Sequence, residues 1–294
     1  MHTIQNCEIC NNSEFYLYIK SEDFSVSQKE FKIVKCKNCN FIFTNPRPKD
    51  ENLGEYYISE KYISHTNTSK GLFEKLYQLV RKHAIKGKFK LASSLIKEGF
   101  ILDIGCGTGE FLNKCKENNW ETKGIEPSKI ARQQAQSNFN LNVSESTDLG
   151  EIEEKVDIIS MWHVLEHVPN LNETLEEFNR ILKHRGNVII AVPNLESYDG
   201  SYYKKHWAAY DLPIHLHHFS ENSISKLFKK HNFKLIKTKG MKFDSYYVSL
   251  LSEEYKFGKK NFIKSFIIGS ISNLFGLFTK RGYSSTIYIF EKGN

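Results

Sequence analysis

An apolar run that enters a glycine-rich turn, FILDIGCGTG at residues 100–109, constrains this 294-residue chain more than any other stretch. The run is typical of a buried strand, and the residues after it are typical of a helix. Gly105, Gly107 and Gly109 would then form a tight turn at the carboxyl edge of a sheet, where a ligand can approach the backbone. Their spacing differs from the G-x-G-x-x-G of dinucleotide sites, and no Gly-Lys-Ser/Thr follows, which excludes a P-loop.

Strand and helix patterns alternate after this turn. Apolar segments at 121–128, 156–165 and 187–194 are separated by amphipathic stretches. The alternation predicts an α/β fold with a parallel sheet and helices on both faces. Glu126 ends the second predicted strand, where a carboxylate can accept hydrogen bonds from both hydroxyls of a ribose. We expect Asp103, just before the glycines, to orient the loop or a cationic ligand.

The first fifty residues contain two Cys-x-x-Cys pairs, and two such knuckles can close one tetrahedral zinc site. The four predicted ligands are Cys7, Cys10, Cys36 and Cys39. Four protein ligands leave no open coordination position, so we expect a structural zinc in a zinc ribbon. A redox dithiol is the alternative. Six cysteines in the whole chain do not form a disulfide scaffold, and no secretion signal is visible, so we expect a cytoplasmic protein.

The segments ILDIGCGTGEFL and GIEPS resemble the S-adenosylmethionine site of class I methyltransferases. The resemblance covers about residues 70–294 and implies a Rossmann-like core with a mostly parallel seven-stranded sheet. It implies that Glu126 binds the ribose, that the glycine loop lies under the methionine part, and that Met161, Trp162 and His163 flank the methyl-donor end. More loosely, it places Ser146, Thr147 and Asp148 near the adenine. The predicted cofactor-binding residues are Asp103, Gly105, Gly107, Gly109, Glu126, Trp162 and His163.

The stretch HVLEH, His163 to His167, matches the H-x-x-E-H signature of one class of zinc peptidase. Pro169 limits any helix here to one turn, which argues against a peptidase. In a methyltransferase the stretch is the turn after the fourth strand. Ubiquinone-type O-methyltransferases have an acid-x-x-Glu-His version that can hold a divalent metal, so His163, Glu166 and His167 could converge on one. We favour the interpretation that Glu166 and His167 cap and pack the turn while His163 lines the donor pocket.

A long segment rich in aromatic and histidine residues, 191–220, follows the fifth strand of the core, and loops of that length are usually functional. Its ending, Asp211 to Ser220, is similar to a segment of bacterial sugar methyltransferases. Some of these, the deoxysugar C-methyltransferases, pair an amino-terminal zinc-binding domain with this core. The resemblance implies that His215 is the catalytic base, with Tyr210 and Asp211 near the site. Histidine suits a hydroxyl nucleophile because its pKa is close to neutral. A structural His215 bonded to backbone is the alternative.

The predicted organisation is a zinc ribbon over residues 1–50, a helical linker or lid over 51–98, and an S-adenosylmethionine-dependent methyltransferase domain over 99–294. The predicted function is methyl transfer from S-adenosylmethionine to a sugar, either nucleotide-linked or in a surface-glycan precursor, at a hydroxyl. The alternatives are an RNA methyltransferase and a quinone or lipid O-methyltransferase at the membrane surface.

The formal net charge of +7 fits an anionic partner without choosing among phosphate-bearing substrates, membranes and nucleic acids. We do not expect nucleic acid, because the second cysteine pair lacks a Cys-x-x-x-His form and no Asn-Pro-Pro-Tyr follows the fourth strand. The apolar stretch 262–278 has basic flanks that include Lys280 and Arg281. It is either a core or dimer helix or a helix lying on an anionic bilayer.

Overall fold

The main sheet of the computed structural model has seven strands in the order β10-β11-β8-β7-β4-β5-β6. Five neighbouring strands, from β8 to β6, run parallel, and β11 and β10 close the other edge antiparallel. The mostly parallel seven-stranded sheet is therefore confirmed. The strands are β4 (Phe100–Ile104), β5 (Glu121–Ile125), β6 (Val143–Ser144), β7 (Val156–Trp162), β8 (Leu182–Pro193), β10 (Phe233–Met241) and β11 (Ser285–Lys292).

The structure describes residues 1–57, 72–279 and 282–293. Residues 58–71 of the predicted linker, and the basic pair Lys280 and Arg281, lie outside the described residues.

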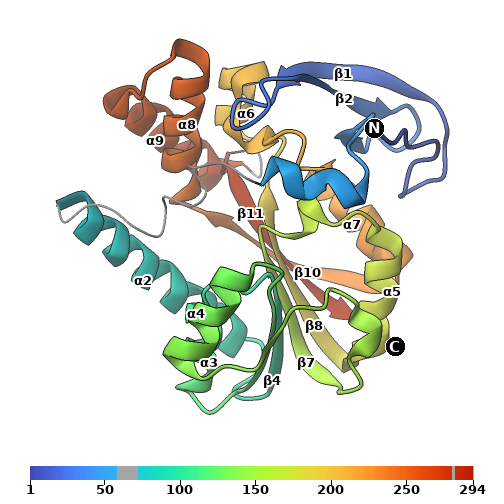
Figure 1. Ribbon diagram of the computed structural model, residues 1–294, viewed down its shortest axis with the longest axis vertical. Coiled ribbons are helices and arrows are strands. Elements are labelled where there is room, and N and C mark those ends of the chain that lie inside the picture. The colour runs from blue at the N-terminus through green and yellow to red at the C-terminus, as the bar shows by residue number, and fades with distance from the viewer. Residues whose placement is uncertain (58–71, 280–281, 294) are drawn as a thin grey trace.

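Helices cover both faces of the main sheet (Figure 1). One face carries α2 (Leu72–Ser93), α3 (Glu110–Lys116) and α4 (Lys129–Phe139), and the other carries α5 (Leu171–Ile181) and α7 (Glu221–Lys230). Alternate strand residues face opposite helix layers, as the two-residue period of a strand requires. Ile158 packs with the α2 side and its neighbour Ile159 with the α5 side. The strands are apolar on both faces because both faces are buried.

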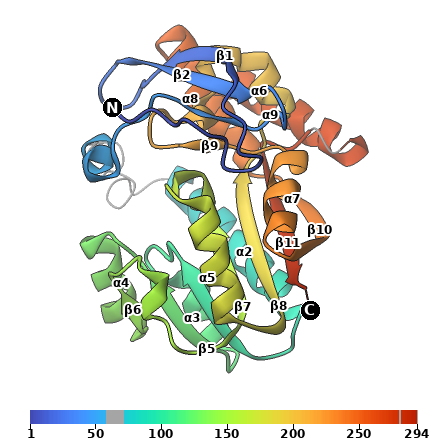
Figure 2. The same cartoon turned by 90° about the vertical axis from the view of Figure 1, so that its right-hand side faces the viewer.

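The amino-terminal module forms a second, four-stranded antiparallel sheet in the order β1-β2-β3-β9. Its first three strands are β1 (Phe15–Glu22), β2 (Glu30–Cys36) and β3 (Ile42–Thr44). The fourth, β9 (His217–His218), comes from the histidine-rich segment after β8, and Phe43 pairs with His217. The module and the core therefore share one sheet, which Figure 2 shows at the upper end of the molecule.

Short helices and one helical hairpin complete the fold. The short 3-10 helices are η1 (Asp50–Tyr56), η2 (Leu149–Glu151), η3 (Leu165–His167), η4 (Lys204–His206) and η5 (Ala208–Tyr210), and α6 spans Tyr198–Tyr203. The hairpin consists of α8 (Asp244–Phe257) and α9 (Phe262–Phe278), inserted between β10 and β11. It packs beside α6, at the opposite end of the molecule from the lower ends of β7 and β4 (Figure 1).

The hydroxyl of Thr44 connects β3 to the histidine-rich segment that supplies β9. Thr44 is fully buried, and its Oγ1 donates to the carbonyl oxygen of His215 at 2.8 Å and lies 3.1 Å from His218 Nε2. We expect Thr44→Val to lower the free energy of unfolding by about 1–3 kcal/mol, because the buried His215 carbonyl loses its donor and His218 Nε2 loses its partner while the side-chain shape is kept. Urea denaturation measures the change. Thr174 is only half-buried, and its hydroxyl donates to the carbonyl of Asn170 just before α5, so Thr174→Val provides the matched control. Equal effects of the two substitutions would contradict the connection.

Candidate functional site

The glycine turn leaves β4 with three residues in the left-handed region, at φ of 71° for Gly105, 56° for Gly107 and 85° for Gly109. A Cβ atom on Gly105 would overlap Val164 of the turn after β7. A Cβ on Gly107 would meet no atom within 4 Å. The turn therefore packs tightly against the protein at Gly105 and presents open backbone at Gly107, where a ligand can approach.

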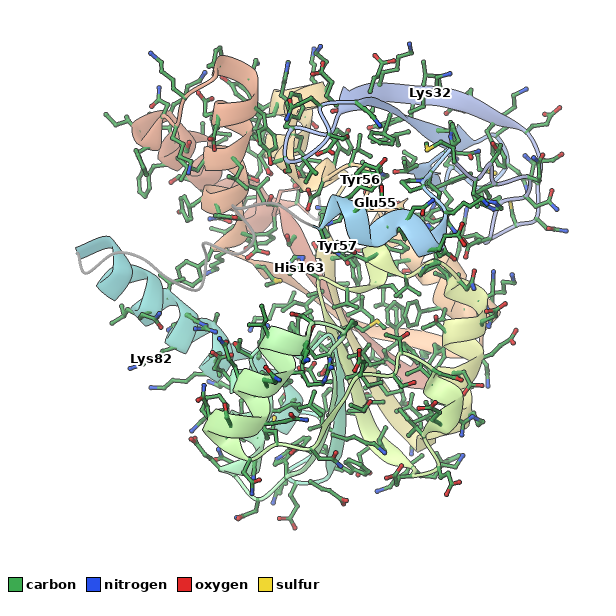
Figure 3. The ribbon with its side chains drawn as sticks, in the orientation of Figure 1. Lys32, Glu55, Tyr56, Tyr57, Lys82 and His163 are labelled. Carbon is green, nitrogen blue, oxygen red and sulfur yellow. The ribbon has the colours of Figure 1, made fainter. Side chains whose placement is uncertain are left out.

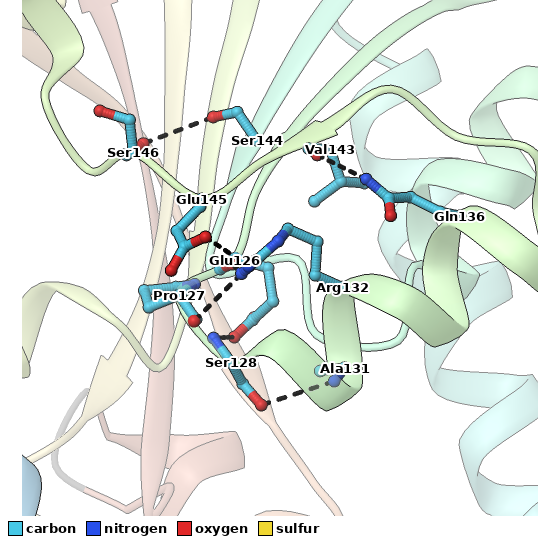
Figure 4. A network of polar contacts seen from close by, with 10 residues as sticks. All are labelled: Glu126, Pro127, Ser128, Ala131, Arg132, Gln136, Val143, Ser144, Glu145 and Ser146. Atoms are coloured by element: carbon cyan, nitrogen blue, oxygen red, sulfur yellow. Dashed lines mark hydrogen bonds and ion pairs between the residues drawn. The ribbon is translucent and has the colours of Figure 1, made fainter.

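Glu126 lies one residue beyond the end of β5, facing this open backbone. Its Oε2 accepts a hydrogen bond from the Gly107 amide at 2.8 Å, and its Oε1 accepts one from the Ser128 amide at 2.8 Å. Arg132 holds the segment after β5 in place. It donates to the Glu126 carbonyl at 2.7 Å and to the Glu145 carboxylate at 2.6 Å (Figure 4). The carboxylate is thus fixed beside the open side of the glycine turn, as the ribose-binding prediction requires.

Asp103 sits at the end of β4 with 2% of its surface exposed. Burial raises the pKa of its carboxyl to about 7. The hydrogen bond that Ser160 donates at 2.5 Å acts in the opposite direction and lowers this pKa. Burial also lowers the pKa of Lys88, which lies on α2, while the charge of Asp103 opposes that shift. The Lys88 ammonium lies 4.3 Å from the ring centre of Trp162. Trp162 itself is buried in the core, with its ring centre 5.5 Å from that of Phe111.

His163 follows β7 with a left-handed φ of 59° and lies between two carboxylates. Its Nε2 is 3.0 Å from Asp244 Oδ2, and its Nδ1 is 3.4 Å from Glu166 Oε1. Burial alone would lower the pKa of His163, but the hydrogen bonds to Asp244 and Glu166 raise it to about 10. His163 is therefore a cation at neutral pH. Figure 3 labels it in the region between the two sheets, below Tyr57 of the segment that follows η1.

Glu166, His167 and His215 converge from two distant segments. One ligating atom of each lies within 4.8 Å of the others, and the two imidazole rings meet edge to face at 4.6 Å. Glu166 is 1% exposed, and the donor nearest its carboxylate among the described residues is His163 Nδ1, 3.4 Å from Oε1. His215 Nδ1 donates to the Ala209 carbonyl at 2.9 Å, which leaves Nε2 with its lone pair. Asp211 Oδ2 lies 3.9 Å from that nitrogen.

Two chemical roles suit this cluster. Burial lowers the pKa of His215, so its imidazole is neutral and able to accept a proton. One carboxylate and two imidazoles are also a donor set that a divalent transition metal accepts. The set differs from the one weighed in the sequence, since in the described residues His215 joins Glu166 and His167 while His163 pairs with Asp244.

The two cysteine knuckles have matching backbone geometry. In each, the first cysteine carbonyl accepts from an asparagine amide four residues later, at 2.8 Å for Asn11 and 3.1 Å for Asn40. Both asparagines have positive φ, which this residue type tolerates. The four sulfur atoms lie within 4.8 Å of one another, with Cys7 and Cys39 3.4 Å apart. Sulfurs bound to one zinc lie about 3.8 Å apart, so the cluster fits the predicted zinc.

Several side chains around the donor turn were not predicted. Arg81 of α2 donates to Thr108 Oγ1 at 3.0 Å and pairs with Glu110, which pins the glycine turn to that helix. Lys88 and Asp244 likewise reach the site from α2 and α8. Charged residues on amphipathic helices normally face solvent, so no sequence signal marked these three.

The other predicted residues are placed as follows. Met161 is buried in the core on the α5 side of the sheet. Asp148 caps η2 by accepting from the Gly150 amide at 2.8 Å, and the exposed Thr147 precedes it. Tyr210 is buried, with its ring centre 5.4 Å from that of His218.

A family model described as "Methyltransferase domain" matches residues 77–238, which is more than half of the chain. The chain belongs to this methyltransferase family. The methyltransferase is 29% identical over 184 residues to a ubiquinone biosynthesis O-methyltransferase of Pelagibacter ubique strain HTCC1062, a match that covers 56% of this chain and 74% of that protein.

Solved structures share the fold of the methyltransferase. A SAM dependent methyltransferase from Archaeoglobus fulgidus is 22% identical, with a TM-score of 0.52, over 75% of this chain and 98% of that one. The magnesium protoporphyrin IX methyltransferase of Synechocystis PCC 6803 with bound SAH is 13% identical, with a TM-score of 0.53, over 83% and 100% of the two chains. The methyltransferase is an enzyme that uses S-adenosylmethionine, and we expect that cofactor at the open Gly107 backbone beside Glu126.

We expect Glu126→Ala to weaken binding of S-adenosylhomocysteine by about 10–100-fold, the scale of losing hydrogen bonds to a charged group. Titration calorimetry of wild type and variant measures the change. Glu154→Ala, which removes an exposed carboxylate that pairs with Lys123, is the control and should bind normally. Normal binding by Glu126→Ala would remove this residue from the donor site.

We expect about one zinc ion per chain in protein purified without chelators, because four thiolates complete a tetrahedral site. Elemental analysis measures the ratio. Cys36→Ser should lose the metal, whereas Cys115→Ala, at a buried cysteine outside the cluster, should keep it. A wild-type protein free of zinc would refute the zinc ribbon.

Proposed function

We propose that this methyltransferase transfers the methyl group of S-adenosylmethionine to a hydroxyl of a sugar, with His215 as general base. One observation carries the proposal. His215 is neutral, its Nδ1 is committed to the Ala209 carbonyl, and its Nε2 keeps a lone pair beside the turn that borders the donor loop. A base that removes a hydroxyl proton needs that protonation state and that tautomer.

The residues divide the work as follows. When bound, S-adenosylmethionine supplies a methyl group already activated on a sulfonium sulfur. Glu126 and the backbone of Gly105–Gly109 would hold it, so that the protein's main task is to align donor and acceptor. His215 would take the proton of the acceptor hydroxyl while its oxygen gains the methyl group, the carbon–sulfur bond breaks and S-adenosylhomocysteine leaves. Glu166, a buried carboxylate, then stabilises the imidazolium that forms on His215.

Two further features support a sugar hydroxyl as acceptor. The chain combines a cysteine-rich amino-terminal module with a methyltransferase core, and its Asp211–Ser220 segment is similar to that of bacterial sugar methyltransferases. The Pelagibacter relative is named as an O-methyltransferase, which supports oxygen as the methylated atom. That relative acts in ubiquinone biosynthesis by its name, so a phenolic acceptor is the second candidate.

We expect methyl transfer from labelled S-adenosylmethionine to nucleotide sugars, and we expect His215→Ala to lower turnover by roughly 100-fold or more, the scale of general-base loss. Affinity for S-adenosylhomocysteine should be unchanged. Because the pKa of His215 is lowered, the wild-type rate should stay high at neutral pH and fall only as the pH drops through that lowered pKa.

The same assay separates the alternatives. A panel of nucleotide sugars, a catechol and a structured RNA shows which acceptor class takes the label. His184→Ala, at an exposed histidine away from the site, is the matched control and should leave the rate unchanged. Label on the catechol alone would replace the sugar with a phenol. A full rate in His215→Ala would remove the base from the mechanism.

A further inference from the structure

Helix α9 packs against the protein through its small residues. The buried face of α9 consists of Ser265, Ile268, Gly269 and Ser272. A Cβ on Gly269 would lie 2.7 Å from Tyr246 Cδ1 and 3.1 Å from the backbone of Ser245, so only glycine permits this approach to α8. Ser272 is fully buried and donates to Asp199 Oδ1 at 2.8 Å. The position of α9 is thus fixed by close backbone contact and polar bonds.

The large apolar residues of α9 point the other way. Seven of them have half or more of their surface exposed: Phe262 (54%), Ile263 (77%), Phe266 (63%), Ile267 (50%), Leu274 (53%), Leu277 (62%) and Phe278 (81%). At about 100° per residue they fall within one stripe, opposite the small residues. A surface helix normally buries its apolar stripe in the core. A contiguous exposed stripe of this kind marks an interaction surface.

Lysines outnumber acidic residues around this stripe. From residue 255 to residue 279 the chain has four lysines and no aspartate or glutamate. Lys264 and Lys260 pair with Glu253 and Glu254 of α8 at 3.1 and 3.8 Å. Lys256 lies over the rings of Tyr202 and Phe257, at 5.3 and 5.4 Å from their centres, which leaves its positive charge available. Phe257 is itself 50% exposed and extends the apolar surface onto the end of α8.

We propose that α9 and the end of α8 dock on the surface of an anionic bilayer, with α9 lying in the plane of the membrane. An apolar stripe beside lysines matches the boundary between acyl chains and anionic headgroups. No helix in the described part of the chain has the length and apolar content to cross a membrane, so contact is limited to one leaflet. A symmetric contact with a second copy would bring the same lysines together, which argues against a dimer on this face.

Vesicle co-sedimentation tests the proposal, using full-length protein with phosphatidylcholine vesicles that contain or lack phosphatidylglycerol. We expect sedimentation with the anionic vesicles, weaker sedimentation with the neutral ones, and partial release by salt. The triple substitution Ile263→Gln, Leu277→Gln, Phe278→Gln should lower the bound fraction about tenfold or more, because it removes apolar surface from the stripe. Lys256→Gln with Lys259→Gln should weaken only the anionic preference.

Matched controls keep the outcomes distinct. Leu17→Gln removes an exposed leucine of β1, outside the hairpin, and should sediment like wild type. All variants should bind S-adenosylhomocysteine normally, since none touches the glycine turn or Glu126, and this confirms that they fold. Wild type that stays in the supernatant, or a triple variant that sediments fully, would overturn the proposal. So would a concentration-dependent dimer that the triple variant abolishes in the absence of vesicle binding.

Discussion

Two backbone hydrogen bonds of Leu216 join the two halves of the enzyme. The amide of Leu216 donates to the Glu166 carbonyl at 2.8 Å, and its carbonyl accepts from the Thr44 amide at 2.9 Å. One buried residue thus connects the turn after β7 with β3 of the cysteine-rich module. His215 precedes it, so the position of that imidazole depends on both neighbours. The amino-terminal module therefore helps to position the proposed base, because its strand β3 is hydrogen-bonded to the segment that carries His215.

Charge balance explains which residues surround the buried carboxylates of the site. Burying a carboxylate is costly unless a cation or several donors compensate it. Glu166 and Asp244 share the protonated His163, and Asp103 has Ser160 as a donor and Lys88 as a nearby cation. These partners come from α2, β7 and α8, so three separate elements must be in place before the site is electrostatically complete. The hairpin that exposes the apolar stripe is one of these elements, through Asp244 at the first position of α8.

The features that the sequence predicted well are formed by residues close together in the chain. The strand that enters Gly105, the acid that ends the next strand, and the two knuckles each lie within a few neighbouring residues, so spacing alone reveals them. The features that it missed are contacts between residues far apart in the chain. Asp244 lies near His163 across 81 residues of sequence, and β9 pairs with β3 across more than 170, and periodicity predicts neither contact. The helix at 262–278 was predicted in one respect and not in another. Its apolar stripe is visible in the sequence, but only the small residues packed against α8 show that the stripe faces outward.

The shared sheet also orders events during synthesis. Strands β1 to β3 leave the ribosome early, and the knuckles that surround them can close at once. Their fourth strand, at His217–His218, follows more than 170 residues behind Thr44. At about 5–20 residues per second that interval is on the order of ten seconds or more. During it the edge of β3 has no strand beside it, and an open edge invites pairing with other chains. During synthesis the edge of β3 therefore stays unpaired until the catalytic domain supplies β9.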